Sequence, residues 1–289
     1  VTGAGGTLGR RVLALLLEQA AGPIIATTRN PAALADFAAR GVDVRAADFD
    51  APSTLRAAFA GAERALLIST DSIATPGHRL AQHQRAIRAL AEAGVRHVVY
   101  TSMPKPEGSA ILIAPDHDGT EKALHASALD FTILRNNIYA DMLLEVLPGA
   151  LASGQLVDAK GDGATAYVWR EDCARVAVAA LADRAHGGRH VVDVSGPAAV
   201  TAREVATLAA EVSGRPLTHV AVSPAAYVDG LVAHGMPQPI AEIFASFDSA
   251  IARGEVAHVG DGVQRLTGQP PRSMRDFLAA HRQALLAKS

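Results

Sequence analysis

The sequence predicts a doubly wound parallel α/β sheet followed by a smaller, mostly helical lobe. A glycine-rich turn, VTGAGGTLG, stands between the tail of a strand and a helix at the start of the chain. Strand and helix patterns then alternate as far as about residue 147, which is typical of βαβ units. Beyond that point the alternation stops. We therefore expect a first domain over residues 1–150 and a closely packed second lobe over residues 151–289.

Each element of the first half has its own signal. The proline at position 31 suits the first turn of a helix, and Gly94 is a usual helix stop. After the strand tail at residues 1–2, we expect strands at 23–28, 42–48, 64–70, 97–102 and 131–135. The alternating helices are expected at 10–20, 31–39, 53–60, 78–94 and 120–127.

The second half is less regular. The segment GQLVDAKGDGATAYVW, residues 154–169, predicts two short strands joined at a Gly-Asp-Gly turn. Helical patterns dominate afterwards, most clearly over residues 200–214. We expect this part to form the substrate lobe.

Composition excludes several classes of protein. The chain has 289 residues and a formal net charge of -2, and its basic residues are scattered, so we expect no nucleic-acid partner. No apolar run reaches membrane-spanning length, and no metal-ligand spacing such as HExxH occurs. The single cysteine, Cys173, fits a reducing cytoplasm and is expected to be buried. Because the sequence opens inside a strand, we expect a few residues to precede Val1.

The opening turn suits a dinucleotide diphosphate. Gly3, Gly6 and Gly9 follow a G-x-x-G-x-x-G spacing, a variant of the dinucleotide-binding fingerprint. Small residues let the backbone approach the phosphates, and the helix N-terminus binds their charge. The spacing alone is a weak signal, since an ordinary strand-to-helix turn also uses glycine. Its place at the head of an alternating chain favours a Rossmann-type domain.

In such sheets the ligand lies beyond the carboxyl ends of the strands. That rule selects residues directly after the expected strands: Arg29, Asp48, Ser69, Thr70, Thr101, Ser102, Met103, Asn136 and Asn137.

The nucleotide preference follows from the residue after the second strand. NAD sites usually carry an acid there, whereas ATTRNP offers Arg29. A guanidinium can bind the 2′-phosphate of NADP, so we expect NADPH, although a surface arginine before a helix is also common. Asp48 is expected either to accept from the adenine amino group or to cap a turn, and both roles can coexist.

The usual acid–base pair of short-chain dehydrogenases, Tyr-x-x-x-Lys, is missing. The residues four positions after the tyrosines at 100, 139, 167 and 227 are Pro104, Leu143, Glu171 and Leu231. Ordinary ketone chemistry, which needs a proton from such a tyrosine, is therefore disfavoured. Two possibilities remain. One is hydride transfer to an acceptor that needs little help from an acid, such as a quinone, and the other is a protein that catalyses no reaction.

Several segments together resemble a known family. VTGAGGTLG, TTRNPAAL, LLISTDS, GVRHVVYTSM, DHDGTEKAL and DFTILRNNIY are similar to the NmrA-like branch of atypical short-chain dehydrogenases. Within that branch they most resemble bacterial NAD(P)H-dependent quinone oxidoreductases and triphenylmethane reductases. The resemblance covers nearly the whole chain, and HxxTEK, from His117 to Lys122, is its most specific motif.

The resemblance implies a cofactor site and an activity. It implies NADPH-dependent quinone reduction without a flavin and without the Tyr-Lys pair. The diphosphate would contact Gly6, Thr7 and Leu8, with Gly3 and Gly9 shaping the turn, and Arg29 would bind the 2′-phosphate. Ribose and nicotinamide contacts would come from Ser69, Thr70, Thr101, Ser102, Met103, Lys122, Arg135, Asn136, Asn137, Ile138, Tyr139 and Arg170. Asn137 and Ile138 depart from the glycine and aromatic residue of close relatives, which changes the expected pocket floor.

Four residues are candidates for the chemistry. His117 would hydrogen-bond the acceptor or donate a proton near neutral pH, or else face solvent at a helix start. Asn137 and Tyr139 would line the nicotinamide, or else cap and pack. Lys122 would bind the ribose, or supply the proton in a reductase of another conjugated acceptor, such as a dye or an enone.

The main hypothesis is a direct hydride transfer from NADPH to a quinone, with catalysis by proximity and orientation. The alternatives are a non-catalytic NADP-binding redox sensor, and a reductase of a dye or enone. We expect a small planar substrate, and a monomer or a homodimer.

Overall fold

The computed structural model describes residues 1–183 and 187–287, and its chain divides into two compact units. Unit 1 contains residues 1–102, 115–135 and 173–192, and unit 2 contains residues 103–114, 136–172 and 193–289. This division differs from the single boundary expected near residue 150. Segments that leave the carboxyl ends of strands enter unit 2, and the chain later returns to complete the sheet of unit 1.

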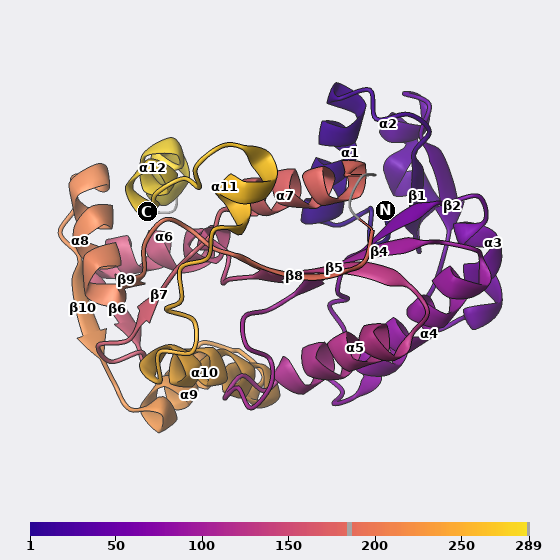
Figure 1. Ribbon diagram of the computed structural model, residues 1–289. Coiled ribbons are helices and arrows are strands. Elements are labelled where there is room, and N and C mark those ends of the chain that lie inside the picture. Colours follow the sequence, from indigo (N-terminus) through magenta and orange to yellow (C-terminus); the bar gives the residue numbers. More distant parts are fainter. Residues whose placement is uncertain (184–186, 288–289) are drawn as a thin grey trace. The chain divides into compact units, whose positions relative to one another are not determined.

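The sheet of unit 1 is parallel where its pairing is recorded (Figure 1). One part has the strand order β1-β2 and the other β3-β4-β5-β8. Val1 and Thr2 join them, because Thr27 donates its N–H to the Val1 carbonyl at 2.8 Å and Thr2 donates to the Leu66 carbonyl at 2.9 Å. The strands are β1 (Ile25–Thr28), β2 (Asp43–Ala46), β3 (Arg64–Leu67), β4 (His97–Ser102), β5 (Asp130–Asn136) and β8 (Arg189–Val194).

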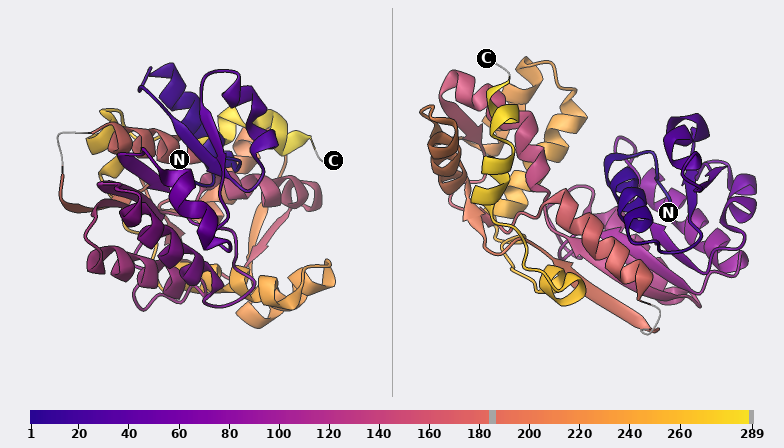
Figure 2. Two further views of the ribbon diagram at one scale, coloured as in Figure 1. Left: turned by 90° about the vertical axis from the view of Figure 1, so that its right-hand side faces the viewer. Right: turned by 90° about the horizontal axis from the view of Figure 1, so that it is seen from above.

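Helices cover both faces of this sheet, with α1 and α7 on one side and α4 and α5 on the other (Figures 1 and 2). The doubly wound fold and the order of its elements are therefore as predicted. The helix expected over residues 31–39 is a 3-10 turn followed by a single short α-helix. The helical elements are α1 (Thr7–Glu18), η1 (Pro31–Leu34), α2 (Ala35–Ala38), η2 (Pro52–Thr54), α3 (Leu55–Phe59), α4 (His78–Glu92), α5 (Ala114–Ala126) and α7 (Arg170–Ala182).

One large apolar cluster of unit 1 lies between the sheet and α4. Every residue of β4 is buried, as expected for a parallel strand covered on both faces. Leu90 of α4, Phe131 of β5 and Phe59 of α3 belong to the same apolar cluster. This packing fixes the carboxyl ends of the strands, where a ligand would bind.

Unit 2 corrects one sequence prediction. Strands β6 (Gln155–Asp158) and β7 (Ala164–Thr165) form where two short strands were expected, but they do not pair as a hairpin. β6 pairs in parallel with β10 (Thr218–Ala221), and β7 pairs antiparallel with β9 (Val200–Thr201). The intervening turn packs on α10 instead, since a Cβ on Gly163 would lie 2.2 Å from the carbonyl oxygen of Ile251.

Helices supply the rest of unit 2, as the sequence predicts. α8 begins with a capping box, in which Thr201 accepts from the Glu204 N–H and Glu204 accepts from the Thr201 N–H. The helical elements are η3 (Ala140–Met142), α6 (Leu143–Ser153), α8 (Ala202–Ser213), α9 (Pro224–Ala233), α10 (Gln238–Ala252), α11 (Gly262–Thr267), α12 (Met274–Ala280) and α13 (Arg282–Leu286).

A buried ionic cluster ties β6, β10 and α10 together. Lys160 lies 3.0 Å from a carboxylate oxygen of Asp158 and 3.7 Å from one of Asp248, and His219 contacts Asp158 at 2.9 Å. Burial acts against the charge of Lys160, but Tyr167 and the two carboxylates outweigh it and raise the lysine pKa. Each charged side chain of this cluster has a partner, so we assign the cluster a structural role in holding β6, β10 and α10 together.

Three expectations from composition can be compared with the described residues. The side chain of Cys173 is fully buried, as expected. Within residues 1–183 and 187–287, no group of His, Cys, Asp and Glu side chains could hold a metal ion. Over the same residues, no helix is long and apolar enough to span a bilayer.

The approach of α1 to the opening turn gives a testable prediction. A Cβ on Gly9 would lie 2.4 Å from the Gly3 carbonyl oxygen and 2.7 Å from Cα of Ala4, so Gly9→Ala must displace the helix. We expect a loss of about 1–3 kcal/mol in the free energy of unfolding, as for other overpacked sites. Urea unfolding followed by circular dichroism measures it.

The matched control is Gly149→Ala in α6, where no heavy atom beyond the adjoining backbone lies within 4 Å of the added Cβ. This variant should be more stable by about 0.5–1 kcal/mol, because alanine loses less chain entropy in a helix. Equal stability of Gly9→Ala and the parent chain would contradict the steric argument.

Candidate functional site

The opening turn presents the bare N-terminus of α1. Gly3 has φ +57, and the Gly6 N–H donates to the Gly3 carbonyl at 3.0 Å, which closes the turn. Gly6 is the N-cap of α1 and provides no side-chain hydrogen bond, and the first turn carries no acid. The first N–H groups and the positive end of the helix dipole therefore suit an anion. The sequence predicted this role for Gly3, Gly6, Thr7, Leu8 and Gly9.

A cavity of about 470 Å³ adjoins this turn. It is built from the glycine turn and from the segments that follow β1, β2 and β3, at the carboxyl ends of the strands. The structure thus brings together six of the predicted cofactor residues: Gly3, Gly6, Arg29, Asp48, Ser69 and Thr70. The tight glycine turn, the uncapped helix and this cavity fit the adenosine and diphosphate part of a dinucleotide.

Arg29 and Asp48 lie on the walls of the cavity. The Arg29 side chain is 71% exposed, and its guanidinium lies 4.0 Å from the carboxylate of Asp71. Asp48 accepts a hydrogen bond from the Asp50 N–H at 2.9 Å, so the turn role expected for it is present. One carboxylate oxygen is used in this way, which leaves the adenine role compatible with the turn.

The wall formed by Ser69 and Thr70 is held by hydrogen bonds from behind. The Ser69 N–H donates to the Thr101 hydroxyl at 2.9 Å, and the Thr70 N–H donates to Nε2 of His83 at 3.0 Å. The Thr70 hydroxyl donates to the side-chain carbonyl of Gln82 at 2.7 Å. The backbone after β3 is thereby fixed relative to α4 and β4.

His83 is a neutral, fully oriented imidazole. Its Nε2 accepts, so the proton lies on Nδ1, which is 2.9 Å from the Thr120 hydroxyl. Burial, followed by the charge of Arg79, lowers the pKa of His83 to about 3. Gln82 and His83 were missed from the sequence. Their signal was two polar residues on the face of α4 that also carries the buried Ala86, Ile87 and Leu90.

His117 lies inside the packing between α4 and the sheet. It is 5% exposed, and its Nδ1 lies 2.9 Å from the hydroxyl of Tyr100. The expectation of a solvent-facing histidine is therefore wrong. Burial, and then the charge of Arg79, lower its pKa well below the ordinary value, so proton donation near neutral pH is at odds with this setting.

Glu121 is a second organiser that the sequence reasoning overlooked. It accepts from the Ser102 hydroxyl at 2.6 Å and binds the Arg135 guanidinium through both carboxylate oxygens, at 3.1 and 2.6 Å. Its side chain is only 7% exposed. The polar atoms of Ser102 and Arg135, which were expected to line the cofactor, are thus joined at the ends of β4 and β5. The signal was the acid inside the TEK motif.

Lys122, one position further along α5, is mostly exposed and pairs with Asp118 at 2.6 Å one helical turn earlier. Its predicted contact with the ribose stays a prediction.

The remaining predicted residues belong to unit 2: Met103, Asn136, Asn137, Ile138, Tyr139 and Arg170. Among them, the Asn136 amide donates to the Tyr139 hydroxyl at 3.2 Å. The Arg170 guanidinium stacks over the Tyr139 ring, 5.3 Å from its centroid, and pairs with Asp141 at 3.2 Å. These contacts set the orientation of the Tyr139 ring.

Asn137 and Met103 have packing roles. The Asn137 amide donates to the Val256 carbonyl at 3.0 Å, and its oxygen accepts from the Ile138 N–H at 2.8 Å. Asn137 is 3% exposed and its side chain is committed to these two bonds, but the N-cap of η3 is Tyr139, so Asn137 packs and does not cap that helix. Met103 packs in an apolar cluster with Ile111 and Ile251.

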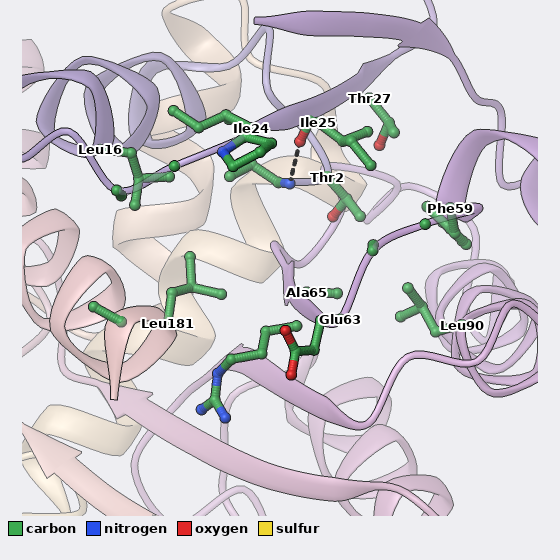
Figure 3. A pocket seen from close by; sticks show the side chains of 18 of the residues that line it. Thr2, Leu16, Ile24, Ile25, Thr27, Phe59, Glu63, Ala65, Leu90 and Leu181 are labelled. Carbon is green, nitrogen blue, oxygen red and sulfur yellow. Dashed lines mark hydrogen bonds between the residues drawn. The ribbon is translucent and has the colours of Figure 1, made fainter. Parts of the chain in front are cut away.

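A larger cavity of about 670 Å³ lies at the other end of the sheet of unit 1 (Figure 3). Leu16, Ile24, Phe59, Leu90 and Leu181 give it largely apolar walls. It borders the amino ends of β1 and β3, whereas doubly wound sheets bind ligands at the carboxyl ends. Size alone therefore does not identify the functional cavity.

The glycine turn, the uncapped helix and the cavity at the carboxyl ends define a dinucleotide-binding α/β protein. A model of the NAD(P)H-binding family matches residues 3–184, in agreement with the site. The chain belongs to this family, in its NmrA-like branch of atypical short-chain dehydrogenases and reductases. The nicotinamide cofactor and the family expected from the sequence are confirmed at this level.

The similarity to known relatives and to solved structures extends over almost the whole chain. Quinone oxidoreductase 2 of Escherichia coli strain K12 is 33% identical over 280 residues, 96% of each chain. The crystal structure of NADPH-dependent quinone oxidoreductase QOR2 from Escherichia coli complexed with NADPH has a TM-score of 0.92 at 32% identity, over 96% of this chain and 98% of that one. The triphenylmethane reductase of Citrobacter sp. complexed with NADP(H) has a TM-score of 0.90 at 33% identity, with coverages of 97% and 98%.

The bonds of Glu121 to Ser102 and Arg135, which we call the Glu121 clamp, give a second prediction. Glu121→Gln leaves Arg135 without its carboxylate, and we expect a loss of about 2–3 kcal/mol in the free energy of unfolding, less than for a fully buried pair because solvent reaches Arg135. Chemical denaturation measures the loss. The control is Glu63→Gln, which removes an exposed pair with Arg96 and should change stability by less than about 1 kcal/mol. Similar effects of both substitutions would contradict the clamp.

Proposed function

We propose that the protein is an NADPH-dependent reductase that passes a hydride directly to a quinone, without a flavin. The observation that carries the proposal is the cavity in which Arg29 stands on the wall beside the bare N-terminus of α1. A guanidinium at that position favours a 2′-phosphate, and the helix end favours a diphosphate. The similarity to quinone oxidoreductase 2 over nearly the full chain supports the choice of acceptor.

When bound, the reduced nicotinamide supplies the hydride. The residues of the chain bind the cofactor and orient it. The first turn of α1 holds the diphosphate, Arg29 holds the 2′-phosphate, and the segment at Ser69 and Thr70 supports the ribose from a position fixed by Gln82 and His83. Orientation of the two reactants then supplies most of the rate acceleration.

The candidate site residues give little help in supplying a proton to the reduced acceptor. Tyr100 is fully buried, bonded to His117, and has a pKa raised by burial, so it does not replace the missing acid of the Tyr-Lys pair. A quinone tolerates this, because its reduced ring stabilises its own anion until water protonates it. We assign the Tyr139 hydroxyl, oriented by Asn136 and Arg170, to hydrogen bonding with the acceptor oxygen.

A second acceptor class is a cationic dye, favoured by the 33% identity to triphenylmethane reductase. A purely regulatory role is less favoured, since the full-length relatives are named as oxidoreductases and reductases. The single buried cysteine supports a place in the reducing cytoplasm.

The direct test is turnover. Purified protein mixed with NADPH and 1,4-benzoquinone should consume reduced nicotinamide faster than the same mixture without protein, and it should do so without added flavin. The loss of nicotinamide absorbance measures the rate. Malachite green in place of benzoquinone tests the dye. Consumption no faster than the uncatalysed rate with benzoquinone would contradict the proposal.

The cofactor preference gives a separate prediction. Arg29→Ala removes charge-assisted hydrogen bonds to the 2′-phosphate, so the Kd for NADPH should rise about 10- to 100-fold, while the Kd for NADH should change less than about twofold. Isothermal titration calorimetry measures both. Arg203→Ala, at an arginine that is 75% exposed on unit 2, controls for the change in net charge. An equal loss for both nucleotides would argue against Arg29 as the phosphate ligand.

A further inference from the structure

Arg29 faces a carboxylate across the nucleotide cavity. Arg29 follows β1 and Asp71 follows β3, and both line the same cavity. The guanidinium and the carboxylate are 4.0 Å apart, and the two side chains are 71% and 89% exposed. Among the described residues, neither has another recorded ion pair. The cation proposed for the 2′-phosphate is therefore balanced by an anion when no phosphate is present.

The position of Asp71 is set by its neighbours. The backbone of Thr70 is bonded to His83, and the Thr70 hydroxyl is bonded to Gln82. The Asp71 carbonyl accepts from the Ile73 N–H at 2.8 Å, which turns the chain directly after this anchor. The residue is thus held on the cavity wall by groups of α4, although its carboxylate is exposed.

We propose that Asp71 is a specificity-determining residue that weakens the preference for NADPH over NADH. It does so by competing with the 2′-phosphate for Arg29. A nucleotide with this phosphate must displace the carboxylate from the guanidinium and bear its repulsion. A nucleotide without it leaves the Arg29–Asp71 pair in place. The inference rests on the proposed role of Arg29.

The size of the effect follows from the exposure of both groups. Opposite charges about 4 Å apart in water attract only weakly, and exposed pairs are screened by salt. We therefore expect a modest change in affinity, confined to the phosphorylated nucleotide and largest at low ionic strength.

The test is Asp71→Asn, which keeps the size of the side chain and removes its charge. The Kd for NADPH should fall about three- to tenfold, and the Kd for NADH should change less than about twofold. Raising the salt concentration should shrink the gain. Calorimetry with each nucleotide measures both constants without any acceptor, so the result is independent of the quinone assay.

Asp162→Asn is the matched control, because Asp162 is fully exposed on unit 2 and pairs with Arg203 at 3.9 Å. It changes the net charge equally and should leave both constants unchanged. In an Arg29→Ala background, Asp71→Asn should have a smaller effect on NADPH than in the parent chain, since the competition is gone.

Four results would overturn the proposal. Three of them are an unchanged Kd for NADPH in Asp71→Asn, an equal shift for NADPH and NADH, and a weaker binding of NADH, which would make Asp71 an acceptor for the ribose hydroxyl instead. The fourth is a full-sized effect in the Arg29→Ala background. Failure of Arg29→Ala to weaken NADPH counts against the proposed function and is read separately from the Asp71 variants.

Discussion

The contact between α1 and the opening turn is the constraint on which the nucleotide site depends. Only a hydrogen at position 9 fits against the Gly3 carbonyl, and this fit brings the helix end to the carboxyl end of the sheet. No side chain caps that end, so its N–H groups are available to a ligand. A structural feature that would weaken an ordinary helix thus becomes a binding feature. The phosphate binding proposed for this turn would therefore rely on backbone groups and not on side chains.

Buried polar groups fix the rest of the cavity wall. His83 and Gln82 hold the segment after β3, and Glu121 joins Ser102 to Arg135 at the ends of β4 and β5. Each of these groups has partners, so burial costs little and orientation is gained. The low pKa of His83 follows from the same buried setting, because burial, and after it the charge of Arg79, disfavours the protonated imidazole. The helices that carry these residues, α4 and α5, therefore hold the residues of the site in place.

The sequence predicts the elements that local chemistry determines. The glycine turn and the alternation of strands and helices are confirmed, and β4 has the predicted bounds, 97–102. The pairing of strands that lie far apart in the sequence is not predicted in this way. The strands on either side of the Gly-Asp-Gly turn exist, but β10 and β9, more than thirty residues away, outcompete the hairpin. Asn137 and His117 show the same limit at the site, since only the fold reveals that Val256 and Tyr100 already occupy their polar atoms.

The residues predicted for the cofactor and those predicted for the acceptor fall largely in different units. The groups that suit the adenosine, the diphosphate and the 2′-phosphate all belong to unit 1, and they rely on backbone and on satisfied buried networks. Tyr139, Arg170 and Ile138 belong to unit 2, where side chains decide shape and polarity. Relatives named for quinone, triphenylmethane and azo reduction match nearly the whole length of this chain. Under the proposed function, which uses no Tyr-Lys pair, these side chains are the ones we expect to influence the choice of acceptor. Of the two departures from the family pattern, Asn137 is committed to the Val256 carbonyl, so Ile138 is the one whose side chain is left to influence the acceptor in the proposed function.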